Sequence, residues 1–199
     1  MSEKHTFVTP GPAGLGALAV ACFGFGAVFT GQVGLGGLPL LSAWLVGGGI
    51  VQVIVAVMEL KDHNITGGNV FLFFSAFFMF GAALSVFSKY LMLSGIMGSV
   101  EPQSIVEGYC WMAGAAFLTA VTPAYLKSPR PLCMIVILLD VALWLIVGLD
   151  LGLLGVSMKP VVGYLLFAAG WIAVYIVAAT VNNHVYGRVV LPTFGSFVK

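Results

Sequence analysis

Six apolar runs, each long enough to cross a lipid bilayer, limit what this chain can fold into more than any other feature of its sequence. A membrane-spanning helix needs roughly 20 consecutive, mostly apolar residues, and a segment that contains Gly, Pro or both separates each run from the next. The sequence therefore predicts an all-α membrane protein, a single six-helix transmembrane domain over residues 1–199 with an N-terminal segment at 1–11 and a C-terminal tail at 183–199. The predicted helices cover residues 12–31, 39–60, 70–93, 105–126, 132–153 and 160–182.

The composition excludes several classes of protein. Only 8% of the 199 residues are charged, whereas about a quarter are charged in a soluble domain. The net charge of +1 gives no basic surface for nucleic acid. The sequence contains no nucleotide-binding loop and no HExxH, CxxC or GxSxG motif, and its three His and three Cys residues are scattered. We therefore expect neither an enzyme nor a bound metal or cofactor.

The distribution of basic residues predicts the orientation in the membrane. Lys and Arg are more frequent in the cytoplasmic loops of membrane proteins. We therefore expect both termini in the cytoplasm, and a multi-pass protein of the inner or plasma membrane. The side that holds both termini carries Lys4, Lys61, Lys127, Arg130, Arg188 and Lys199, and the opposite side carries Lys89 and Lys159.

Asp140 is the clearest candidate for chemistry inside the membrane. It lies near the middle of the predicted fifth helix, where its apolar helical neighbours cannot neutralise a carboxylate. An ionisable side chain at this depth is costly and is a functional candidate by default. Asp140 must face water in a pore, find a polar partner on another helix, or stay protonated.

The second predicted helix carries two further polar side chains on one face. Gln52, Ala56 and Glu59 are spaced so that they point the same way from a helix. Such a face could line an entry vestibule, or Glu59 could instead pair with Lys61 at the membrane interface. Three successive glycines at 47–49 are expected to interrupt this helix.

The first predicted helix begins at Thr9-Pro10-Gly11-Pro12, with Thr at the cap and Pro in the first turn. The free backbone N–H groups at such a helix end suit a carboxylate that arrives from the cytoplasm.

The order of these motifs resembles the acetate/succinate transporter family. The family begins with Asn-Pro-Ala-Pro-Leu-Gly, has Gly-Gly, a Gln and a Glu on its second helix, then a Gly-Asn-Thr-Phe-Gly loop, and ends with Gly-Arg-x-Val-Leu-Pro. The resemblance covers residues 9–192. The matching segments here are Thr9-Pro10-Gly11-Pro12-Ala13-Gly14, then Gly48-Gly49, Gln52 and Glu59, then His63-Asn64-Ile65-Thr66-Gly67, and finally Gly187-Arg188-Val189-Val190-Leu191-Pro192.

The resemblance implies a six-helix protomer with its own pore, assembled as a homohexamer. It also implies a proton-coupled or channel-like passage for acetate and, in some members, succinate. By position, the hydrophobic constriction of the family falls on Leu18, Phe74 and Leu139. The substrate pathway is expected to include Thr9, Gln52, Glu59, Asn64 and Thr66.

Among the differences from the family pattern, three lie at or beside the expected constriction. Leu18 stands where the family often has Phe, and Phe74 where it often has Tyr, so a phenolic hydroxyl is missing from the expected constriction. Asp140 replaces what is commonly a small polar residue. These differences bear on substrate preference more than on fold.

The function that we expect is transport of a small monocarboxylate, acetate above all, with protons as partner and Asp140 as the group that couples proton movement to it. An acetate anion gains little from entering an apolar gap, whereas acetic acid or a proton–acetate pair can pass. One alternative is a passive pore for a neutral solute such as urea, ammonia or an undissociated acid. A membrane scaffold that docks a partner without transport is a second alternative, and the short loops disfavour it.

Overall fold

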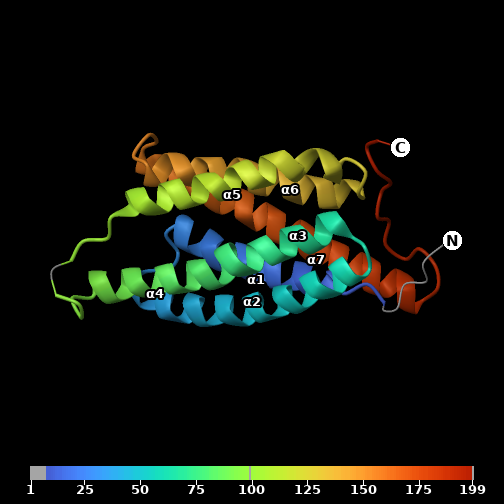
Figure 1. Ribbon diagram of the computed structural model, residues 1–199, viewed down its shortest axis with the longest axis horizontal. Coiled ribbons are helices and arrows are strands. Elements are labelled where there is room, and N and C mark those ends of the chain that lie inside the picture. Colours follow the sequence, from blue (N-terminus) through green and yellow to red (C-terminus); the bar gives the residue numbers. More distant parts are fainter. Residues whose placement is uncertain (1–7, 99, 199) are drawn as a thin grey trace.

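All six predicted runs form helices in the computed structural model, which describes residues 8–98 and 100–198 (Figure 1). Within those residues, six helical spans are long and apolar enough to cross a membrane, and there is no β-strand. The all-α membrane fold predicted from the sequence is thereby confirmed. The helices are α1 (Gly11–Phe29), α2 (Leu38–Lys61), α3 (Ile65–Phe74), α4 (Ala82–Leu93), α5 (Ser104–Tyr125), α6 (Arg130–Asp150) and α7 (Lys159–Val185), with 3-10 turns η1 (Leu35–Gly37) before α2 and η3 (Val156–Met158) before α7.

The local sequence explains where most helices begin and end. A proline lies in the first turn of α1, α2, α6 and α7, where its missing N–H costs no hydrogen bond. Gly31 and Gly152 follow α1 and α6 with φ angles of +75° and +71°, a backbone conformation that favours glycine. Helix α7 continues through Val185, so the tail begins at residue 186 rather than at 183.

The third span is not one regular helix. Helix α3 ends at Phe74, a π-helical segment (η2) covers Ser75–Gly81, and α4 then continues to Leu93. The Ser75 hydroxyl donates a hydrogen bond to the Leu72 carbonyl oxygen at 2.7 Å. Nothing in the sequence analysis predicted this distortion in mid-span. Short π-helical segments are frequent at functional sites.

The prediction that the glycines at 47–49 interrupt the second span is wrong, because α2 is one continuous helix. Two of these glycines instead make room for the third span. A Cβ atom on Gly49 would lie 2.8 Å from the Phe80 ring, and one on Gly48 would lie 3.1 Å from the Met79 Sδ. The small residues therefore let the π-helical segment pack closely on α2.

Each span packs against its neighbours so that the contacts run in a ring around the bundle. Helix α1 packs against α7 and α2, α6 packs against α5 and α7, and α2 packs against the third span. Small residues allow α1 and α7 to approach closely, since a Cβ atom on Gly163 would lie only 2.9 Å from the Gly26 carbonyl oxygen.

Aromatic contacts and one ion pair join the third span to α5 and complete this ring. Phe73 stacks on Phe117 with ring centroids 4.2 Å apart, which joins α3 to α5 in mid-bundle. Farther from the chain termini, Lys89 of α4 forms an ion pair with Glu107 of α5, and the Ser85 hydroxyl also donates to Glu107. This side of the bundle therefore depends on side-chain contacts more than on close backbone approach.

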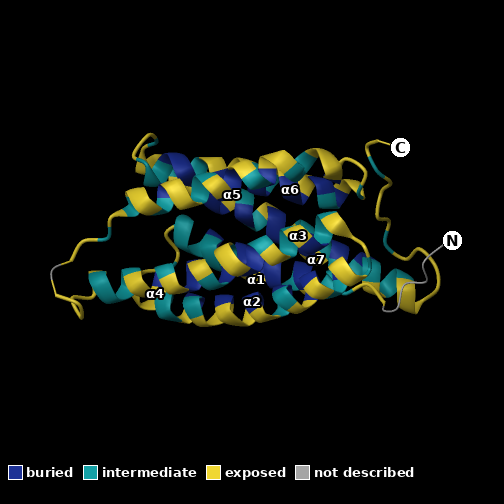
Figure 2. Cartoon of the chain, in the orientation of Figure 1, coloured by how far each residue is buried: buried dark blue, intermediate teal, exposed yellow. Residues whose placement is uncertain are grey.

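The outward faces of the bundle are apolar. Trp44, Leu84 and Trp171 are 67%, 70% and 67% exposed, and exposed residues extend along the whole bundle (Figure 2). A surface of this kind suits the hydrocarbon interior of a bilayer.

The described ends of the chain lie at the same end of the bundle (Figure 1). The basic residues divide between the two ends as the sequence predicted, apart from Lys4 and Lys199, which lie outside the described residues. That the chain termini face the cytoplasm stays a prediction. Lys61, Lys127, Arg130 and Arg188 lie near the chain termini, and Lys89 and Lys159 lie at the opposite end.

Candidate functional site

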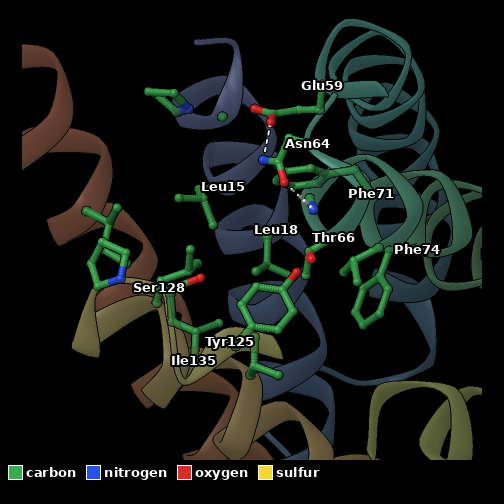
Figure 3. A pocket seen from close by; sticks show the side chains of 18 of the residues that line it. Leu15, Leu18, Glu59, Asn64, Thr66, Phe71, Phe74, Tyr125, Ser128 and Ile135 are labelled. Atoms are coloured by element: carbon green, nitrogen blue, oxygen red, sulfur yellow. Dashed lines mark hydrogen bonds between the residues drawn. The ribbon is translucent and has the colours of Figure 1, made fainter. Parts of the chain in front are cut away.

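A cavity of about 260 Å³ enters the bundle from the end that holds the chain termini. Its volume is well above the roughly 10–15 Å³ that one water molecule needs. All six spans contribute residues to its wall, and the lining extends from Gly11 and Glu59 at this end to Leu139 in mid-span. Figure 3 shows several of the lining side chains close together. The wall contains every residue expected in the substrate pathway and in the constriction: Thr9, Gln52, Glu59, Asn64 and Thr66, and Leu18, Phe74 and Leu139.

Glu59 is the acidic group of the cavity. Its side chain is buried at the end of α2, with Oε2 accepting a hydrogen bond from Asn64 Nδ2 at 2.5 Å and Oε1 lying 3.4 Å from the Thr9 hydroxyl (Figure 3). The sequence left open that Glu59 pairs with Lys61, but no ion pair joins these two residues in the described part of the chain. The carboxyl group is therefore fixed by neutral donors at the mouth of the cavity.

Asn64 holds two elements of the mouth together. Its Oδ1 accepts a hydrogen bond from the backbone N–H of Gly67 at 3.1 Å, which caps the start of α3. Its Nδ2 donates to Glu59 at the same time. Because an amide has its acceptor and its donors on opposite sides, these two contacts fix the orientation of the side chain.

Gln52 lies deeper in the cavity wall, and only 1% of this residue is exposed. Its Nε2 is 3.5 Å from the Gly14 carbonyl oxygen on α1, and its Oε1 is buried without a hydrogen-bond partner among the described residues. Gly14 precedes Leu18 by one helical turn, so the amide of Gln52 lies about one turn before the constriction.

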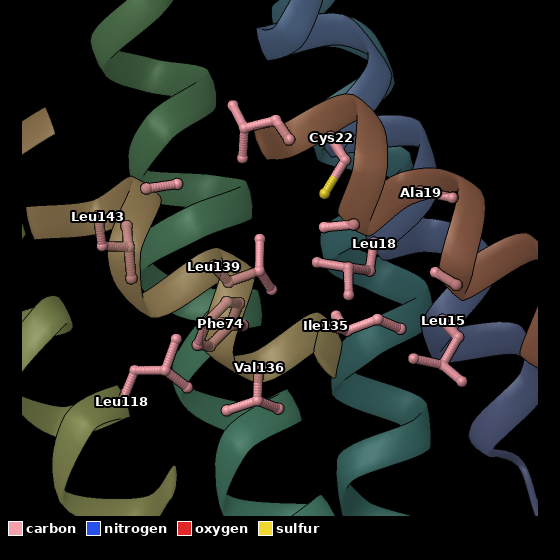
Figure 4. Packing of buried hydrophobic residues seen from close by; sticks show 14 of the residues in the cluster. Leu15, Leu18, Ala19, Cys22, Phe74, Leu118, Ile135, Val136, Leu139 and Leu143 are labelled. Atoms are coloured by element: carbon pink, nitrogen blue, oxygen red, sulfur yellow. The ribbon is translucent and has the colours of Figure 1, made fainter. Parts of the chain in front are cut away.

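Leu18, Phe74 and Leu139 form the inner limit of the cavity and are all buried (Figure 4). None of the residues one turn farther along these helices, Cys22, Phe78 and Leu143, contributes to the cavity wall. Phe74 stacks on Phe78 with ring centroids 4.1 Å apart, and the π-helical segment begins directly after Phe74. The three side chains therefore close the cavity with apolar groups in mid-span.

Asp140 does not line this cavity, although it is next to Leu139 in sequence. Its Oδ1 accepts a hydrogen bond from the Thr119 hydroxyl on α5 at 2.7 Å. Trp144 Nε1 donates to the same hydroxyl oxygen at 3.0 Å. Of the three alternatives that the sequence left open for Asp140, the structure shows a polar partner on another helix. A role of Asp140 in proton coupling stays a prediction, and the cavity geometry lends it no support.

Comparison with known proteins places the chain in a family. Over residues 1–198 the sequence matches the GPR1/FUN34/yaaH family. The chain belongs to this family. A protein of Methanothermobacter thermautotrophicus, described as an uncharacterized protein, is 29% identical over 192 residues, which cover 93% of this chain and 91% of the relative. The structure of the bacterial acetate channel SatP has the same fold, with a TM-score of 0.76 at 21% identity over 94% of this chain and 99% of SatP.

The family match confirms the resemblance found in the sequence. Separately, the structure adds three hydroxyl groups to the cavity wall. Tyr125, Ser128 and Thr180 line the cavity, and the sequence analysis did not single them out. All three lie close to the same end of the bundle. All three lie in or just after the last turn of a predicted helix, on the side that holds the chain termini. This shared position is the sequence feature that could have marked them as cavity residues.

Proposed function

We propose that this protein carries a small monocarboxylate, acetate in the first place, across the membrane through the cavity and past the constriction of Leu18, Phe74 and Leu139. On this proposal it is a transporter or channel and not an enzyme. Membership of the GPR1/FUN34/yaaH family and the fold shared with the acetate channel SatP support this choice of solute.

One observation carries the proposal. Eight residues expected to contact the solute come from different helices and from loops far apart in sequence, and all of them line one cavity. The cavity is polar near its mouth and apolar at its inner end. A solute that enters at the mouth must pass the constriction to reach the other side.

The mouth has features that attract a carboxylate. Helices α1, α3 and α6 all begin there, and Gly11, Thr66 and Pro129 from their first residues or caps line the cavity. The N-terminal end of a helix carries free N–H groups and a positive partial charge, which favour anions. The hydroxyl groups of Tyr125, Ser128 and Thr180 add further donors.

The constriction sets the form in which the solute passes. Leu18, Phe74 and Leu139 present no polar atom that could replace the water around an anion. A neutral acid, or an anion together with a proton, passes such a gap at a lower cost. We therefore retain proton-coupled transport and a passive pore for a neutral solute as the two forms of this function.

The proposal also covers the membrane, the orientation of the chain and its oligomeric state. The excess of basic residues at the end with the chain termini supports a cytoplasmic position for that end, in an inner or plasma membrane. Assembly as a homohexamer is proposed on the family resemblance alone.

Uptake of labelled acetate by liposomes that contain the purified protein tests the proposal, with and without an imposed inward proton gradient. Uptake above that of protein-free liposomes supports acetate transport. Accumulation against the acetate gradient that requires the proton gradient indicates coupling, and rapid equilibration without accumulation indicates a passive pore. Uptake equal to that of protein-free liposomes would contradict the proposed solute.

A further inference from the structure

Gln52 is the one buried side chain in the described cavity wall whose polar atoms are left largely unsatisfied. Its Oε1 has no hydrogen-bond partner among the described residues, and its Nε2 reaches the Gly14 carbonyl oxygen only at 3.5 Å. That distance is at the long limit for an N–H···O hydrogen bond. Within the protein, the acceptor of this amide is therefore unpaired and its donor is only weakly held, while the residue itself forms part of the cavity wall.

The neighbouring backbone fixes which atom of the amide is the acceptor. Nε2 faces the Gly14 carbonyl oxygen, which can only accept a hydrogen bond. The opposite assignment would place Oε1 against this oxygen, so that two acceptors would face each other. Gln52 thus has an orphaned acceptor and a weakly held donor next to each other, one helical turn before Leu18.

An amide with both groups free matches a particular kind of solute. An undissociated carboxylic acid has an O–H donor and a carbonyl acceptor side by side, so it can donate to Oε1 and accept from Nε2 at once. A carboxylate anion has only acceptor atoms, so it satisfies Nε2 and leaves Oε1 unpaired or facing a negative oxygen. A buried polar atom left unpaired is costly, which is why sites of this kind discriminate strongly between donors and acceptors.

Glu59 at the mouth acts in the same direction. Its carboxyl oxygens, already held by Asn64 and Thr9, add acceptors rather than donors to the wall through which the solute enters. An undissociated acid brings an O–H donor that such acceptors can bind, whereas a carboxylate brings none.

We propose that the Gln52 amide is the selectivity site of the cavity and that it binds the undissociated acid through a pair of hydrogen bonds, so that the proton crosses the constriction on the solute. This inference rests on the proposed function and specifies the form of its substrate. The acid keeps its own proton throughout, and no protein group needs to change its protonation state. The acid and the proton therefore cross the membrane together.

Acetamide provides the probe, because it has the size of acetic acid, carries an N–H donor beside its carbonyl group and stays neutral at every working pH. We expect an excess of acetamide to inhibit labelled-acetate uptake by the wild-type protein in liposomes. Nitrate, a planar anion that has only acceptors, is the matched control and is expected to inhibit much less. Inhibition by nitrate that equals or exceeds inhibition by acetamide would overturn the inference.

Gln52→Met keeps the length of the side chain and removes both polar atoms. We expect acetate uptake to fall roughly tenfold and the inhibition by acetamide to disappear. Because an unsatisfied buried amide is removed, the thermal unfolding midpoint should be unchanged or higher, so loss of fold does not explain the loss of uptake. Retention of acetamide inhibition in Gln52→Met would refute the role of this amide.

If the wild-type protein gives no acetate uptake above protein-free liposomes, the proposed function fails and the inference is tested separately. Entry of acetamide itself, followed by the swelling of liposomes, then reports on the Gln52 site. Faster acetamide entry in the wild type than in Gln52→Met supports the site, and equal entry overturns it.

Discussion

At the scale of single residues, the mouth of the cavity depends on Asn64, which both caps α3 and holds Glu59. Substitution Asn64→Ala removes the cap, so we expect a loss of about 1 kcal/mol of stability and an unfolding midpoint lower by roughly 2–4 °C. Acetate uptake should also fall, because Glu59 loses its closest donor. Thermal unfolding in detergent and liposome uptake measure the two effects.

Asn69→Ala is the matched control for this prediction. Asn69 is on the next turn of α3, its Nδ2 donates to the Ile65 carbonyl oxygen at 2.8 Å, and it does not line the cavity. We expect this variant to keep both the midpoint and the uptake of the wild type within error. Equal losses in the two variants would show that α3, and not the Asn64 contacts, is the sensitive feature.

Asp140 is a second residue whose position makes a clear prediction. Its contact with Thr119 lies outside the cavity, and Asn can accept the same hydrogen bond. We therefore expect Asp140→Asn to keep the rate of acetate uptake and its dependence on pH, measured in liposomes over a series of pH values. A changed pH dependence would instead support the proton-coupling role that the sequence suggested.

At the scale of helices, the bundle depends on the close approach of α1 and α7. A methyl group on Gly163 would lie 2.9 Å from the Gly26 carbonyl oxygen and 2.5 Å from Thr30 Cγ2, and the backbone oxygen cannot move aside. We expect Gly163→Ala to lose about 1–3 kcal/mol of stability. The unfolding midpoint in detergent should fall accordingly.

Gly47→Ala is the control for a glycine inside a membrane-spanning helix. No atom lies within 4 Å of a Cβ placed there, so the methyl group meets no neighbour. Because Ala is favoured over Gly in a helix by roughly 0.5–1 kcal/mol, the midpoint should stay the same or rise. A decrease equal to that of Gly163→Ala would mean that contact between α1 and α7 is not the cause.

The third span shows what helix-scale patterns in the sequence cannot reveal. Its apolar run predicted a helix over residues 70–93, but the run is equally apolar in an α-helix and in a π-helix. The π-helical segment packs into the space that Gly48 and Gly49 leave on α2, about thirty residues earlier in the chain. Contacts of this kind join segments that are far apart in the chain, and the pattern of a single sequence does not reveal them.

At the scale of the whole molecule, apolar length and turn residues are enough to predict the six spans, because a bilayer accepts few structures other than helices of that length. The matched motifs also predicted the residues that meet in the cavity, among them Gln52, Asn64 and Leu139. The partner of Asp140 could not be predicted in this way. Thr119 lies on another helix, and its hydroxyl is placed beside Asp140 only by the packing of α5 on α6.

On the proposed function, a solute passes through the bundle from the mouth of the cavity to the constriction. Leu139 is buried at the constriction, whereas Ile137, two residues earlier on α6, is 43% exposed on the outer face. A smaller side chain at Leu139 should widen the path and a larger one should block it. The same change at Ile137 should affect neither the path nor the solute.

The most direct measurement is therefore labelled-acetate uptake by liposomes that contain the wild type, Leu139→Ala, Leu139→Trp or Ile137→Trp. We expect faster uptake for Leu139→Ala, uptake close to that of protein-free liposomes for Leu139→Trp, and wild-type uptake for Ile137→Trp. A loss of stability lowers uptake in both Leu139 variants, so opposite changes can come only from the width of the path. Equal rates in all four proteins would contradict passage through this constriction.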